Sequence, residues 1–120
     1  MAINLRKISY SLQTALNSKG QKILYAREQW YSNDKGAMNM YTVSKARWNP
    51  EKGRNENVLL FKSYKQVFTV LFLRDYWYYL NGVSIPRDNP MWDEYKDSHP
   101  NVMETIEQYA VEVDDGESEE

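Results

Sequence analysis

The chain of 120 residues has no cysteine and a single histidine, His99. The missing cysteines exclude disulfides, thiolate metal sites and cysteine nucleophiles, and they are typical of a reducing compartment. One imidazole excludes a metal site built on two histidines of the same chain. Because His99 precedes Pro100 between two predicted helices, we expect it to be a loop or cap residue.

Glycine is also scarce, and its positions carry no cofactor motif. The five glycines form neither G-x-G-x-x-G nor the phosphate-binding G-x-x-x-x-G-K pattern. We therefore expect no cofactor, no metal and no catalytic residue. A paired-carboxylate hydrolase stays open through Asp75, Asp88, Asp93 and Glu94, but Asp75 follows Arg74 on a predicted helix, where an ion pair or an exposed stripe is the simpler interpretation.

No apolar run approaches the length of a membrane span. The longest nearly uncharged stretch, 67–73, is far below the roughly 20 residues needed to cross a bilayer. Residues 1–7 lack the apolar region of a signal peptide. We expect a soluble, cytoplasmic protein that does not bind membranes.

What the sequence does contain is aromatic residues, at 14%, and a charge that is divided along the chain. Residues 1–64 carry eleven Lys/Arg against four acids, and residues 65–120 carry four against thirteen. The length is that of one domain, which we place at 1–111. The segment 112–120 has six acids in nine residues and is predicted to be a disordered acidic tail. Such a tail aids solubility, competes with a polyanionic ligand of the basic half, or mimics nucleic acid.

Hydrophobic periodicity predicts a helix at 3–18, followed by a β-hairpin at 22–48 around a turn at 32–36. The outgoing arm of this hairpin also fits a helical spacing, and we favour a strand because the turn joins it to the convincing strand 40–43. Residues 49–56 are rich in charge and in helix and strand breakers, which predicts an exposed loop. Residues 58–61 then form a short buried strand.

The second half of the chain is predicted to be helical. Ser63 is a candidate N-cap for an apolar helix at 64–80, closed by Asn81 and Gly82. Asn89 and Pro90 open a short helix at 91–95. Asn101 with Glu104 resembles a capping box for a last helix at 102–110. The fold class is α+β, a three-stranded antiparallel sheet packed against helices in the order α-β-β-β-α-α-α.

Basic and aromatic residues alternate around the hairpin and the following loop. Aromatic rings among cations are the elements of a single-strand nucleic-acid platform, but one face of a sheet also needs aromatics to pack on helices. A protein-binding face is the third interpretation. The candidate residues for binding nucleic acid or a partner are Arg27, Trp30, Tyr31, Lys45, Arg47, Trp48, Lys52 and Arg54.

The stretches 63–66, 71–82 and 85–89, together with Trp92, resemble small uncharacterised proteins encoded by phages and mobile elements of Gram-positive bacteria. The resemblance implies an accessory protein, a class that commonly binds host or phage components, and it transfers no functional residue. We therefore expect a non-catalytic protein that binds and modulates a protein partner. The alternative is a nucleic-acid-binding module that uses the hairpin at 22–54, with the acidic tail as its competitor.

Overall fold

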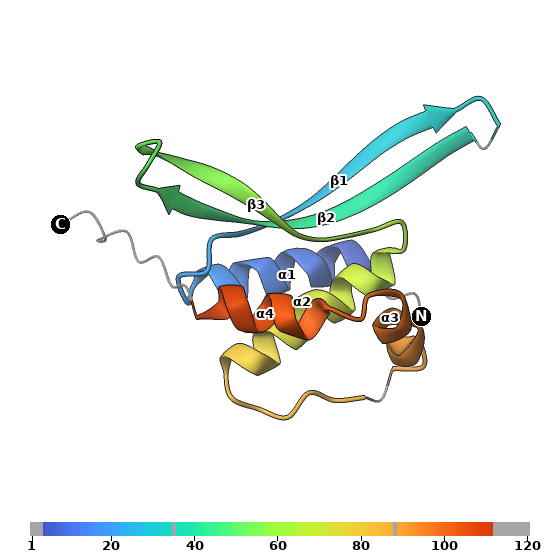
Figure 1. Cartoon of the computed structure of the whole chain (residues 1–120). Coiled ribbons are helices and arrows are strands. Elements are labelled where there is room, and N and C mark those ends of the chain that lie inside the picture. Colours follow the sequence, from blue (N-terminus) through green and yellow to red (C-terminus); the bar gives the residue numbers. More distant parts are fainter. Residues whose placement is uncertain (1–3, 35, 88, 112–120) are drawn as a thin grey trace.

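The chain folds in the order α-β-β-β-α-α-α, as the sequence predicts. The computed structural model describes residues 4–34, 36–87 and 89–111. Strands β1 (Ile23–Ser32), β2 (Gly36–Asn49) and β3 (Arg54–Ser63) form one antiparallel sheet in the order β1-β2-β3. The fold is therefore α+β, with the sheet as one layer and the helices as the other (Figure 1).

All four helices lie on one side of the sheet (Figure 1). They are α1 (Leu5–Asn17), α2 (Gln66–Leu80), α3 (Trp92–Ser98) and α4 (Val102–Ala110). No helix of the described residues is long and apolar enough to span a bilayer. The residues 112–120, for which we predict disorder, lie outside the described part of the chain.

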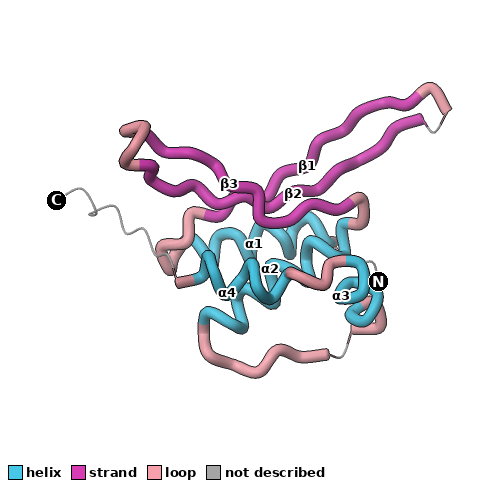
Figure 2. The backbone as a smooth tube through the Cα atoms, viewed as in Figure 1, coloured by secondary structure: helices cyan, strands magenta, loops and turns pink. Residues whose placement is uncertain are grey.

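Strand β2 pairs with β1 through residues 36–45 and with β3 through residues 41–49. Only 41–45 is paired on both sides, so beyond this centre the sheet continues as two two-stranded ribbons. Figure 2 shows that the ribbons diverge in a V that opens away from the helices. We call them the first arm, formed by β1 and β2 within 26–40, and the second arm, formed by β2 and β3 within 46–57.

The hairpin prediction is confirmed, including a strand for its outgoing arm. Gly36 at the turn is left-handed, with φ 71°. The prediction for 49–56 is wrong in part. β2 extends to Asn49 and β3 begins at Arg54, which leaves a turn of four residues with Gly53 at φ 64°. These strand ends cannot be predicted from the sequence, because both faces of the second arm are largely solvated. Apolar and polar residues therefore do not alternate there.

A β-bulge in β3 brings two consecutive side chains into the core. Val43 pairs with Phe61 and Ser44 pairs with Leu59, so Leu60 has no partner residue on β2. Normally successive side chains point to opposite faces of a sheet. The extra residue changes this alternation, and both Leu60 and Phe61 are buried against the helices.

The helix ends differ in detail from the predicted caps. Asn4 caps α1, because its side-chain Oδ1 accepts a hydrogen bond from the Lys7 amide at 3.0 Å. Helix α2 begins at Gln66, two residues later than predicted, and the Ser63 hydroxyl accepts a hydrogen bond from the Lys65 amide in the preceding turn. Helix α4 spans its predicted range, but the Asn101 side chain makes no capping hydrogen bond.

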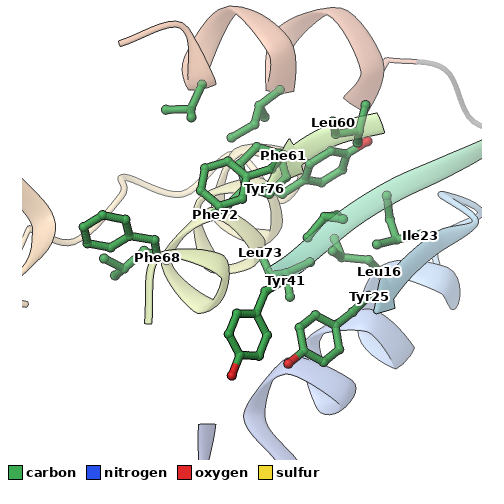
Figure 3. Close-up of a cluster of buried hydrophobic side chains, with 14 of the residues drawn as sticks. Leu16, Ile23, Tyr25, Tyr41, Leu60, Phe61, Phe68, Phe72, Leu73 and Tyr76 are labelled. Atoms are coloured by element: carbon green, nitrogen blue, oxygen red, sulfur yellow. The ribbon is translucent and has the colours of Figure 1, made fainter. Parts of the chain in front are cut away.

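The core lies between the centre of the sheet and α2 (Figure 3). Phe61 of β3 stacks on Phe72 of α2, with ring centroids 4.8 Å apart. Helices α3 and α4 also supply buried residues: Tyr95, Val102, Ile106 and Ala110. The hydrophobic core therefore lies on the one face of the sheet that contacts the helices.

We predict that Leu71→Ala on α2 lowers the free energy of unfolding by about 2–5 kcal/mol, because it opens a cavity in this core. The matched control is Leu24→Ala, which removes the same atoms from a half-exposed site on β1 and should cost less than about 1 kcal/mol. Urea denaturation of both variants measures the two changes. Equal losses would contradict the placement of the two leucines.

Candidate binding surface

Strand alternation divides the sheet into an inner face toward the helices and an outer face away from them. The register and the burial of the central residues assign each side chain to a face: Ile23, Tyr25, Tyr41 and Val43 are buried, while their neighbours are not. The outer face consists of Leu24, Ala26, Glu28, Trp30, Met38, Met40, Thr42, Ser44, Ala46, Trp48, Asn55, Asn57, Leu59 and Lys62.

No described helix covers the outer face (Figures 1 and 2). At its centre Leu24, Ser44 and Leu59 lie side by side across the three strands, with Leu24 51% and Leu59 52% exposed. Trp30 on the first arm is 43% exposed and Trp48 on the second is 48% exposed. The outer face is thus an apolar surface with a tryptophan on each arm.

The two tryptophans are far apart, and each belongs to a different arm. Trp30 pairs with Met38, so the separation of the two along β2 is that between Met38 and Trp48, roughly 30 Å. The Tyr64 ring lies beside Trp30, with centroids 6.5 Å apart, and widens the apolar surface of the first arm.

The candidate arginines lie on the opposite face. Arg27, Arg47 and Arg54 alternate with the outer-face residues and belong to the inner face, as does the exposed Tyr31. Among the strand residues that the structure describes, the outer face carries charge only at Glu28 and Lys62. The predicted mixture of aromatic rings and cations therefore separates into an apolar outer face and a polar inner face on the arms.

Lys45 is the one candidate residue that is buried, at 1% exposure. Its ammonium donates hydrogen bonds to the Gln21 side-chain Oε1 at 2.8 Å and to the Tyr109 carbonyl at 2.9 Å. The Tyr76 hydroxyl donates to the same Gln21 oxygen, and the Gln21 amide donates to the Ala110 carbonyl at 3.1 Å. A phosphate cannot reach this ammonium, so the proposed role of Lys45 in binding is wrong. Lys45 instead holds the end of α4.

The other basic candidates lie at the surface. Arg27, Lys52 and Arg54 are exposed, and Arg47 is half-buried with its guanidinium 5.8 Å from the centre of the Tyr109 ring. Tyr31 is 75% exposed. The structure thus keeps seven of the eight candidates at the surface and distributes them over two arms and two faces.

Asp75 is buried, so the exposed stripe is wrong, and it forms an ion pair with Lys96. Its Oδ2 lies 3.0 Å from the Lys96 ammonium and accepts a hydrogen bond from the Tyr95 hydroxyl at 3.1 Å. Burial raises the pKa of Asp75, and Lys96 and Tyr95 offset the rise only in part. Burial and the adjacent carboxylate also raise the pKa of Tyr95. This cluster joins α3 to α2.

The remaining titratable candidates are dispersed. Glu94 forms an ion pair with Lys65, Asp93 is exposed, and Asp88 lies outside the described residues. His99 packs on Phe61 and Phe68, with ring centroids 4.6 Å and 5.9 Å away. Its imidazole lies partly exposed at the edge of the core, and His99 is the C-cap residue of α3.

Leu24 and Leu59 are surface residues that the sequence reasoning did not single out. The signal was present, because 23–25 and 58–61 are continuous apolar runs within strands. When one face of a strand is buried, a continuous run must place some of its apolar side chains on the other face. Such runs therefore predict a sheet that is apolar on both faces.

No protein-family model, no curated protein and no solved structure matches the chain.

We predict that Asp75 makes stability depend on pH in a direction set by its raised pKa. A raised folded-state pKa contributes stability that is fully present below the unfolded pKa, near 3.8, and is lost as the pH rises through the folded value. Compared with Asp75→Asn, which does not titrate, the natural chain should therefore gain stability as the pH falls from 7 to 4. Urea denaturation at several pH values measures the difference, and parallel curves for the two chains would refute the raised pKa.

Proposed function

We propose that the protein is a non-catalytic accessory protein that binds and modulates a protein partner through the outer face of its sheet. The observation that carries this proposal is an uncovered apolar face with a half-exposed tryptophan on each of its two arms. Exposed apolar surface of this kind is typical of protein interfaces, and tryptophan is among the residues that contribute most to their affinity.

The chemistry of the outer face indicates what kind of partner fits it. The central row is Leu24, Ser44 and Leu59. Charge is confined to Glu28 on the first arm and to Lys62, which pairs with Thr42 beside this row. A polyanion would gain little there, since affinity for phosphates depends on Lys and Arg. We therefore propose an apolar, convex protein surface as the partner, which fits between the arms of the V.

The alternative function, nucleic-acid binding, is supported by the inner face of the arms. There Arg27 and Tyr31 on the first arm, and Arg54 on the second, are exposed. The stacking platform would need rings and cations on one surface, and in the described part of the chain the inner face of the arms offers one exposed strand aromatic, Tyr31, on the same arm as Arg27. The resemblance to small phage proteins implies an accessory protein that binds host or phage components, which fits either function.

We predict that Trp30→Ala and Trp48→Ala each weaken partner binding about tenfold or more, which is the effect of losing over about 1.4 kcal/mol at an interface hot spot. Tyr31→Ala is the matched control, because Tyr31 is the neighbour of Trp30 on the same arm but lies on the inner face. Full-length baits of the four chains are used for affinity capture, and each recovered protein is then purified and titrated by calorimetry.

A partner whose affinity falls with both tryptophan variants and persists with Tyr31→Ala supports the proposal. Self-association in analytical ultracentrifugation with the same dependence supports it too, with a second copy as the partner. If no recovered protein depends on either tryptophan, the proposal fails. Tight binding of a labelled single-stranded 20-mer that falls with Arg27→Glu and Arg54→Glu, and not with Trp30→Ala or Trp48→Ala, would replace it by the nucleic-acid function.

A further inference from the structure

A second surface is formed where the end of α4 meets the base of the second arm. The last carbonyls of α4, at Tyr109 and Ala110, are held by hydrogen bonds from Lys45 and Gln21. The Arg47 guanidinium lies over the Tyr109 ring at 5.8 Å. These contacts fix the point from which the chain continues beyond Val111.

Basic residues lie near this point. Arg47 flanks it on β2, whereas the Lys45 ammonium is buried in the contacts just described and is not available to a ligand. Further along the second arm, Lys52 and Arg54 are exposed. The acids of the arm are Glu51 and Glu56. Glu56 lies opposite Arg47 in the strand register, and its carboxylate accepts a hydrogen bond from the Asn49 side chain at 3.2 Å. The available cations Arg47, Lys52 and Arg54 therefore exceed these acids by three to two.

The segment that starts here, 112–120, has the opposite charge, with six acids in nine residues. Nine residues reach about 30 Å when extended. The second arm measures roughly 23 Å from Lys45 to the turn at Lys52. The acidic segment therefore begins beside the basic arm and is long enough to follow it to its tip.

We propose that the segment 112–120 binds the inner face of the second arm through Arg47, Lys52 and Arg54, and that this face is a binding site for acidic peptide segments. In the single chain the site is filled by its own tail. An acidic segment of another protein must displace the tail to bind. This site and the outer face lie on opposite sides of the sheet, so each proposal can fail without the other.

Because the tail belongs to the same chain as the site, it binds there more readily than a separate peptide does. Individual surface ion pairs are weak, and salt screens them within about 8–10 Å. A short flexible connection, however, holds the tail at an effective concentration on the order of 1 mM. If the free peptide binds with a Kd of about 0.1 mM, the tail occupies the site most of the time and weakens competing peptides about tenfold.

The test uses the full chain and a full-length variant whose tail acids are replaced by their amides, Glu112→Gln, Asp114→Asn, Asp115→Asn, Glu117→Gln, Glu119→Gln and Glu120→Gln. The probe is a labelled peptide with the sequence of residues 111–120, followed by fluorescence anisotropy at low salt. We expect the neutralised chain to bind the peptide about tenfold more tightly than the natural chain, and binding to weaken steeply as salt is added.

Arg54→Glu in the neutralised chain should reduce peptide binding at least tenfold. Arg27→Glu is the matched control, since Arg27 is an exposed arginine of the inner face on the other arm, and it should leave the affinity within about twofold. In parallel, amide signals of 47–57 should shift between the natural and neutralised chains in two-dimensional NMR spectra, while those of 26–32 should not.

Three results would overturn the proposal. The first is no peptide binding by the neutralised chain. The second is an equal loss with Arg27→Glu and Arg54→Glu, which would indicate only general attraction between opposite charges. The third is a labelled single-stranded DNA 20-mer that displaces the peptide and binds the neutralised chain more tightly through Arg54, which would assign the face to nucleic acid.

Discussion

The structure depends on the pairing of one long strand with two partners that overlap for only part of its length. Residues 41–45 of β2 are paired on both sides, and their inward side chains Tyr41, Val43 and Lys45 are all buried. These side chains join the sheet to the hydrophobic core that the helices form. Because the rest of β2 extends beyond the helices, two arms follow from the same pairing.

Lys45, at the centre of the sheet, joins other elements through hydrogen bonds as well as packing in the core. A buried ammonium is unfavourable unless its donors are satisfied, and here they hold the Gln21 side chain and the end of α4. A cation at a helix C-terminus is also favoured by the helix dipole. This residue therefore couples the sheet, the turn after α1 and the last helix, and sets the place at which the acidic segment begins.

The sequence was sufficient for the order of elements, since 58–61 and the apolar helix α2 are marked by strong hydrophobic runs. It was insufficient for the ends of β2 and β3 at Asn49 and Arg54. There the strands pair through their backbones in solvent, and no alternation of apolar and polar side chains indicates the pairing. The bulge at Leu60 could not be predicted either, because it depends on the pairing with β2. For the candidate site, alternation along β1 already placed Arg27 and Trp30 on opposite faces, but the burial of Lys45 required the position of α4, which no local pattern provides.

The arms have a consequence for how such a protein changes over evolutionary time. Their side chains contribute little to the core, so we expect the tips to accept substitutions and insertions at little cost to folding, except at Gly36 and Gly53, whose positive φ would strain any other residue. The base at 41–45 and the helices are constrained by packing, so the sequence of the arms can change while the scaffold stays the same.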